Sequence, residues 1–252
     1  MEAILAAGIG LMLGSFLSVL IGRWPHWRGA AAGRSHCPNC MHVLAWYDLV
    51  PLASWVWLRG KCRYCGGPIS TLYPVLELTT AAVLATAVIV SGVATMWSLL
   101  GLVVLFGLVG LFFFDLVHHM LPDAIVYPLA LLVVARIAYY RPDQLVNALA
   151  TGVLLSSLLA LLFFYSRGRW LGFGDVKLAF VIGALFGYPM AVGVTLAAIW
   201  GGALAGVGLM VFRRATMQTA LPFGSFWTAA AIATLLAPSW IAYLSGLLTP
   251  AF

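Results

Sequence analysis

Residues 172–189 read GFGDVKLAFVIGALFGYP, in which a glycine-rich turn containing Asp175 leads directly into an apolar run. The chain has only seven acidic residues, and three of them, Asp115, Asp123 and Asp175, lie at the edges of long apolar segments. Inserting a carboxylate at bilayer depth costs about 2.5–3.5 kcal/mol on insertion scales, so acidic residues in membrane segments usually have a functional role. Two such carboxylates that share a proton could activate a water molecule.

The composition indicates an integral membrane protein. Of the 252 residues, 63% are hydrophobic and only 8% are charged, whereas a soluble domain carries about 25% charged residues. The net charge of +6 does not indicate nucleic-acid binding, because the basic residues are spread over loops. The first apolar run, Ala3 to Ile21, is long enough to span a bilayer and precedes no small-residue cleavage site, so we expect no cleavable signal peptide.

Long apolar segments predict an all-α polytopic membrane protein with about eight transmembrane helices. A span needs about 20 apolar residues. The candidates are 3–22, 74–92, 97–116, 123–140, 144–165, 175–189, 190–212 and 222–247. This division predicts three parts: a first transmembrane helix (1–22), a small polar subdomain (23–73) and a membrane domain (74–252).

The placement of basic residues predicts the orientation. They lie in the loops after the first, fifth and seventh candidate spans: Arg23, Arg28, Arg34, Arg59, Lys61, Arg63, Arg167, Arg169, Arg213 and Arg214. The opposite side has little beyond Arg136 and Arg141. The positive-inside rule therefore places the 23–73 loop in the cytoplasm and both termini outside. It also places Asp115 and Asp175 at the cytoplasmic end of their spans.

All four cysteines fall in the polar loop, as Cys37-Pro-Asn-Cys40 and Cys62-Arg-Tyr-Cys65, with 21 residues between the pairs. This spacing is typical of a structural zinc site, because two tight turns can each supply two thiolates to a tetrahedral ion. One zinc per chain would also stabilise a loop that is too short to form a core of its own. Free thiols or disulfides are the alternatives, and a reducing cytoplasm argues against disulfides.

The acidic residues allow a catalytic and a structural interpretation. In an aspartyl dyad one carboxyl stays protonated and the other acts as a base toward a water molecule. Alternatively, Asp175 caps a helix and Asp115 is an interfacial carboxylate that reaches water. We expect Asp123 to be structural, because Leu121-Pro122-Asp123 predicts a turn with a helix N-cap. His118 and His119, which follow Asp115, are expected to be water-exposed residues at the membrane interface.

Two motifs resemble those of a known family. The segment from Phe114 to Asp123 is similar to the first aspartate motif of type IV prepilin peptidases, and Gly172 to Lys177 is similar to their second, the GxGD motif. Residues 37–77 resemble the family's cytoplasmic segment. Gly14-Ser15-Phe16-Leu17 and Pro222-Phe223-Gly224 fit as well. The likeness covers most of the chain.

The resemblance implies a bacterial inner-membrane aspartyl protease in which Asp115 and Asp175 are the catalytic pair. Its substrates would be type IV prepilins and secretion pseudopilins, cut on the cytoplasmic side before a hydrophobic helix. Methylation of the new N-terminus with S-adenosylmethionine is also implied, with Glu77 as a candidate cofactor-site residue or, alternatively, simply the end of the loop. The expected supporting residues are Gly172, Gly174, Lys177 and Asp123.

Two other functions compete with this one. A zinc-stapled membrane scaffold of a pilus or secretion assembly would need the cysteines but not an acidic residue between a glycine-rich turn and a span. A transporter that uses Asp115 and Asp175 as proton carriers would place carboxylates near the bilayer midplane rather than at its edge. Neither the substrate nor the oligomeric state follows from the sequence.

Overall fold

A computed structural model describes residues 1–25, 33–91, 96–212 and 221–237. Outside these ranges lie three basic residues used to predict the topology, Arg28, Arg213 and Arg214. The last ten residues of the predicted span 222–247 also lie outside them. The chain divides into two compact units, Met1–Val93 and Ala94–Phe252. Within the described ranges the elements of both units are helices, together with two isolated β-bridges in the first unit, so the prediction of an all-helical fold is confirmed.

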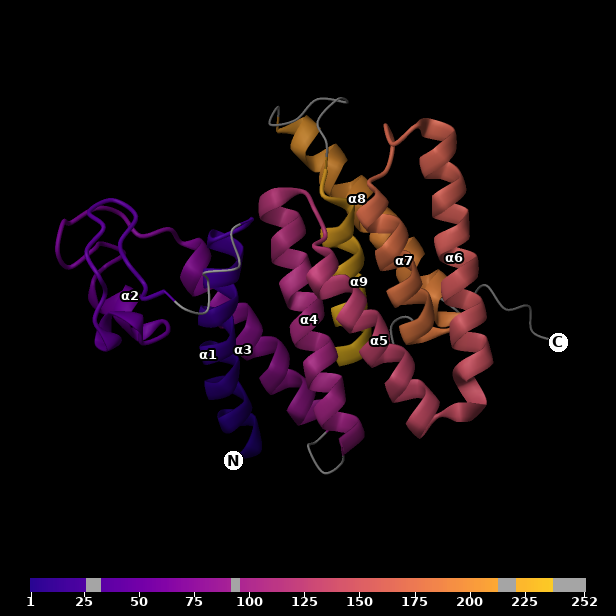
Figure 1. Cartoon of the computed structure of the whole chain (residues 1–252), viewed down its shortest axis with the longest axis horizontal. Helices are drawn as coiled ribbons and strands as arrows, with labels where there is room; N and C mark the ends of the chain where they lie inside the picture. The colour runs from indigo at the N-terminus through magenta and orange to yellow at the C-terminus, as the bar shows by residue number, and fades with distance from the viewer. Residues whose placement is uncertain (26–32, 92–95, 213–220, 238–252) are drawn as a thin grey trace. The chain divides into compact units, whose positions relative to one another are not determined.

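The first unit is built on two long helices, α1 (Glu2–Gly22) and α3 (Leu72–Ser91), which pack against each other (Figure 1). The polar segment between them contains only a 3-10 turn, η2 (Trp46–Leu49), and a short helix, α2 (Ala53–Trp57). The two long helices approach closely because glycines face the contact. A Cβ atom added to Gly10 would lie 2.6 Å from the Cα atom of Ala81.

The second unit contains the remaining helices of the described chain. They are α4 (Met96–His118), α5 (Asp123–Tyr140), α6 (Leu145–Ser166), α7 (Phe173–Phe186), α8 (Met190–Val211) and α9 (Phe223–Leu236), with the turn η3 (Pro142–Gln144) before α6. Helix α7 contacts α5, α6, α8 and α9, and Leu178, Ala179, Val181 and Ile182 on it have no exposed surface. An apolar helix surrounded in this way forms the core of the unit.

Six of the eight predicted spans coincide with helices that are long and apolar enough to cross a membrane. The other two, α7 and the described part of α9, have 14 residues each. At 1.5 Å per residue such a helix is about 21 Å long, less than a hydrocarbon core of about 30 Å. Helix α7 ends early because Gly187, with φ of 63°, terminates it. The count of eight spans therefore stays a prediction.

The glycine contact between α1 and α3 generates the first testable expectation. Gly10→Val should lower the melting temperature of the purified protein, because overpacking a tight helix contact costs about 1–3 kcal/mol. Gly8→Val is the matched control on the same helix, since a Cβ atom there meets nothing within 4 Å. Thermal denaturation in detergent measures both. Equal melting temperatures for the two variants would contradict the packing.

Candidate active site and candidate metal centre

The four cysteines lie on two turns with the same backbone pattern, knuckle 1 (residues 36–43) and knuckle 2 (residues 61–68). In each turn the N–H of the first cysteine donates to the carbonyl five residues later, at 2.9 and 2.8 Å. The N–H four residues after that cysteine donates back to its carbonyl, at 2.9 Å in both turns. An antiparallel bridge flanks each turn, and Met41 and Gly66 occupy the same position with φ of 57° and 69°.

These turns bring the sulfur atoms of Cys37, Cys40, Cys62 and Cys65 within 4.8 Å of one another. The Cys37 and Cys65 sulfurs are 3.9 Å apart, and no disulfide joins any of the four. Tetrahedral zinc with Zn–S bonds of about 2.3 Å separates its sulfur ligands by about 3.8 Å. The arrangement therefore fits a metal ion bound by four thiolates, as the spacing of the cysteines predicts.

The protonation of the thiols favours the same conclusion. Hydrogen bonds from the backbone of Cys40 and Asn39 lower the pKa of Cys37 to about 7. For Cys65, a hydrogen bond from the Gly67 backbone favours the thiolate, but burial and the neighbouring thiols raise the pKa to about 11. Four adjacent thiols cannot all ionise without a cation between them, because like charges oppose one another.

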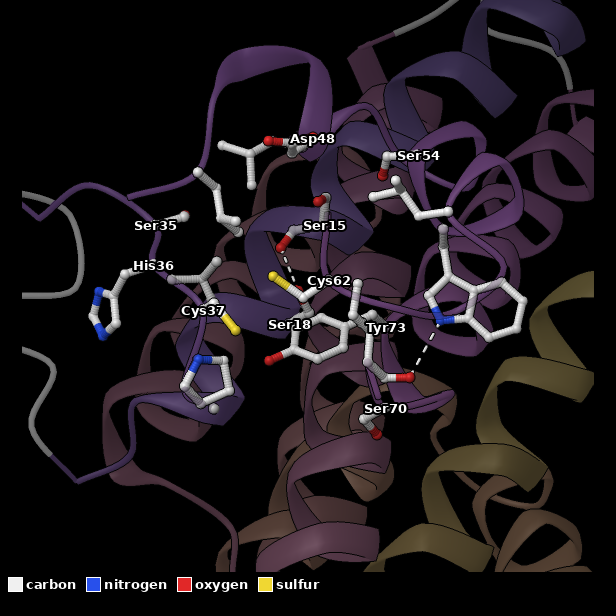
Figure 2. A pocket seen from close by; sticks show the side chains of 18 of the residues that line it. Ser15, Ser18, Ser35, His36, Cys37, Asp48, Ser54, Cys62, Ser70 and Tyr73 are labelled. Atoms are coloured by element: carbon white, nitrogen blue, oxygen red, sulfur yellow. Dashed lines mark hydrogen bonds between the residues drawn. The ribbon is translucent and has the colours of Figure 1, made fainter. Parts of the chain in front are cut away.

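A cavity of about 420 Å³ lies beside the knuckles within the first unit (Figure 2). Its lining combines side chains from α1, both knuckles, α2 and α3, among them Ser15, Ser18, Cys37, Cys62, Trp55, Tyr73 and Glu77. A volume of this size is in the range of small-molecule sites, about 300–1,000 Å³. The cavity could therefore hold a cofactor-sized ligand.

Glu77 is the buried acid of this cavity, with 6% of its surface exposed. Its Oε2 atom accepts a hydrogen bond of 2.8 Å from the Leu52 N–H. Leu52 has φ of 59°, a conformation that an L residue adopts at a cost. Since α3 begins at Leu72, Glu77 lies inside the helix rather than at the end of the loop.

An ion pair at the cavity joins η2 to knuckle 2. Arg63 Nε donates to Asp48 Oδ1 at 2.8 Å, and the Tyr64 hydroxyl donates to Asp48 Oδ2 at 3.1 Å. Burial opposes ionisation of Asp48, but these two donors outweigh it and lower the pKa of the carboxyl. Asp48 is therefore an anion that holds the two parts of the cavity wall together.

In the second unit, Asp115 lies near the end of α4 and is only 5% exposed. The alternative of an interfacial carboxylate that reaches water is therefore wrong. Its Oδ2 atom accepts a hydrogen bond of 2.6 Å from the Ser225 N–H and one of 2.9 Å from the Ser225 hydroxyl. Ser225 is in the first turn of α9, whose N-cap residue Pro222 makes no side-chain cap. Asp115 thus supplies a second, closer acceptor for the Ser225 N–H, which also donates to the Pro222 carbonyl at 3.2 Å.

Asp175 lies in the first turn of α7, where its Oδ2 atom accepts a hydrogen bond of 3.2 Å from the Gly172 N–H. The N-cap position itself belongs to Gly172. The helix dipole favours an anion in this turn.

Leu121 connects the two aspartates. A Cβ atom added to Gly174 would lie 3.1 Å from Leu121 Cβ, and one added to Gly224 would lie 3.2 Å from Leu121 Cδ1. The Gly224 atom would also lie 3.0 Å from Asp115 Oδ2. The glycine turn before Asp175 and the start of α9 thus meet at one side chain, and the Asp115 carboxyl lies against the same start of α9.

The remaining acidic residue of the two motifs, Asp123, pairs with Lys177. Asp123 is the first residue of α5 and Pro122 is the N-cap, so the prediction of Asp123 as the cap is wrong by one position. The Lys177 ammonium lies 5.6 Å from the centre of the Tyr127 ring and 5.5 Å from that of Phe173. This pair connects α5 to α7 beside the aspartates.

Sequence reasoning singled out Asp115 and Glu77 but missed the hydrogen-bond partner of each. Ser225, the partner of Asp115, directly follows the Pro222-Phe223-Gly224 motif, which was the only signal for it. Leu52, the partner of Glu77, lies within the 37–77 segment, but nothing in the sequence pointed to this contact. Of the two histidines, His119 is exposed and His118 is half-buried.

The chain is similar to known proteins over most of its length. Residues 9–91 match the bacterial peptidase A24 N-terminal domain, and residues 102–207 match the type IV leader peptidase family. The prepilin leader peptidase/N-methyltransferase of Aeromonas hydrophila is 33% identical, covering 94% of this chain and 88% of the relative. The type 4 prepilin-like proteins leader peptide-processing enzyme of Escherichia coli O78:H11 is 34% identical, covering 92% and 93%. No solved structure matches the chain. The chain therefore belongs to the type IV leader peptidase family.

Proposed function

We propose that the chain is a membrane-embedded aspartyl endopeptidase that removes the basic leader from type IV prepilins or pseudopilins. The observation that supports this proposal is that the glycine turn of Asp175, at the start of α7, and the start of α9, which holds Asp115 by two donors, both lie against Leu121. Similarity to prepilin leader peptidases over most of the chain supports the choice of substrate.

The proposed chemistry needs one protonated and one ionised carboxyl. The ionised aspartate takes a proton from a water molecule, whose oxygen forms a bond to the scissile carbonyl carbon. The protonated aspartate donates its proton to the carbonyl oxygen. The resulting diol then collapses and the C–N bond breaks: the aspartate that took the water proton gives it to the leaving nitrogen, and the other aspartate takes a proton from a diol hydroxyl. Both aspartates thereby return to their starting state.

The cleavage site is expected at the cytoplasmic face of the bacterial inner membrane. The basic loops after the first, fifth and seventh predicted spans support this orientation. A prepilin presents a basic leader followed by an apolar helix, so the positive leader stays in the cytoplasm while the helix enters the bilayer. Asp115 and Asp175 lie at helix ends, the depth at which such a substrate exposes its scissile bond.

We further propose that the first unit methylates the new N-terminus. S-adenosylmethionine would supply the methyl group as part of a sulfonium cation. The cavity suits such a ligand, because it combines the buried Glu77 carboxylate with the aromatic rings of Trp55 and Tyr73. Carboxylates and aromatic faces both stabilise cations. Glu77, held by the Leu52 N–H, would supply the negative charge for this cation.

Zinc is the metal proposed for the four-cysteine cluster. Four thiolates leave no open position on a tetrahedral ion, so its role would be structural. Knuckle 1 and knuckle 2 would then be fixed at their observed separation. A membrane scaffold would also use this cluster, but it gives no reason for Asp115 and Glu77 to be buried and hydrogen-bonded.

The dyad is tested by Asp115→Asn and Asp175→Asn. Each should reduce the cleavage rate of a purified prepilin by at least about 100-fold, because proton transfer by a positioned carboxyl contributes about 10²–10⁴-fold. The control is Asp123→Asn, which should change the rate by less than about fivefold, because an exposed ion pair contributes up to about 1 kcal/mol. Full activity in either dyad variant, with folding verified by thermal denaturation, would refute the assignment.

The methyl-transfer site is tested by Glu77→Gln. In a reaction with prepilin and S-adenosylmethionine, methylation should fall about 10- to 100-fold, because a hydrogen bond to a charged group contributes about 1.5–3 kcal/mol. Cleavage should be unchanged. Mass spectrometry of the mature N-terminus reports both reactions. Glu2→Gln, at an exposed residue of α1, is the matched control. Normal methylation by Glu77→Gln would exclude the role.

Metal analysis of purified protein tests the zinc centre. We expect one zinc per chain, and serine at any of the four cysteine positions should remove it and lower the melting temperature, because three ligands hold the ion less tightly. Ser35→Ala, next to knuckle 1, should retain the metal. A protein that contains no zinc yet cleaves and methylates prepilin would contradict the assignment.

A further inference from the structure

Ser225 makes an unusually specific contact with Asp115. The serine is 3% exposed and lies in the first turn of α9, 110 residues from the aspartate in the sequence. Its N–H and its hydroxyl both donate to the same atom, Asp115 Oδ2, at 2.6 and 2.9 Å. Since both donors end on Oδ2, the other carboxylate oxygen, Oδ1, is left for Asp175, water or substrate.

Capping of α9 alone does not account for this contact. The Ser225 N–H donates to the Pro222 carbonyl at 3.2 Å as well as to Asp115, so the helix start needs no side-chain donor at this position. The hydroxyl adds a second donor to the same oxygen, although the Phe112 carbonyl is an alternative acceptor at 3.4 Å. Two donors from one rigid helix turn fix both the position and the rotation of the carboxylate more firmly than one donor.

The neighbouring glycine leaves room for the carboxylate. A Cβ atom added to Gly224 would lie 3.0 Å from Asp115 Oδ2 and 3.1 Å from its Cγ atom, so any larger residue would displace the group. The start of α9 therefore combines an open position at Gly224 with two donors at Ser225. Together these two residues of α9 form a binding position for the Asp115 carboxylate of α4.

We infer that Ser225 is a positioning residue of the peptidase site, which holds Asp115 through Oδ2 so that Oδ1 faces the reaction. This inference rests on the proposed aspartyl peptidase function. Ser225 itself touches neither water nor substrate in this role. It acts through Asp115, so its loss should slow the chemical step and leave substrate binding unchanged.

The test measures kcat and KM for cleavage of a purified prepilin by the full-length protein in detergent. Ser225→Ala should lower kcat about 10- to 100-fold with KM unchanged, because a hydrogen bond to a charged group contributes about 1.5–3 kcal/mol. Ser225→Thr, which retains the hydroxyl, should restore most of the rate. For Ser225→Cys, whose thiol is a weaker donor of nearly the same size, kcat should lie between the values for the Thr and Ala variants.

Thr234→Val is the matched control, because it removes a buried hydroxyl of α9 that donates only to the Ala230 carbonyl of its own helix. It should leave kcat unchanged. Equal kcat for the Ala, Cys and Thr variants at position 225 would overturn the inference, as would an equal loss in Thr234→Val. Asp115→Asn in the same assay separates failure of the peptidase proposal from failure of the positioning role. If Asp115→Asn is inactive while Ser225→Ala is fully active, only the positioning role of Ser225 fails.

Discussion

A buried carboxylate in an apolar helical unit is stable only when hydrogen-bond donors reach it, and the second unit meets this requirement by joining three helix ends. Asp115, near the end of α4, accepts hydrogen bonds from the N–H and the hydroxyl of Ser225 at the start of α9. Asp175 accepts one at the start of α7. Each contact satisfies a helix terminus and an acid simultaneously. The packing of the unit thereby determines where each carboxyl group lies.

Helix α7 is short because glycines lie at both of its ends. The helix begins at the glycine turn that carries Asp175 and ends at Gly187, so it is shorter than a bilayer-spanning helix. Helices α5, α6, α8 and α9 pack around it. A short core helix is compatible with an acid in its first turn, because neighbouring helices provide the surrounding apolar surface.

Much of this could be predicted from the sequence. Apolar runs locate the long helices, because their length is set by the bilayer, and the two C-x2-C pairs predict the sulfur cluster from local turn geometry. The partners of the acids could not be found in this way. Ser225 and Leu52 contact Asp115 and Glu77 across 110 and 25 residues, and such pairs depend on helix packing. Nor does a single sequence distinguish a 14-residue core helix such as α7 from a span, because both are apolar.

Knuckle 1 and knuckle 2 share a backbone pattern although one has Met41 where the other has Gly66. Their first cysteines, Cys37 and Cys62, also line the cavity, whereas the second unit contains no cysteine. If the cluster holds zinc and the cavity is the proposed methyl-transfer site, zinc would determine the shape of that site and not of the proposed peptidase site. Zinc starvation would then reduce N-terminal methylation while leader cleavage continued.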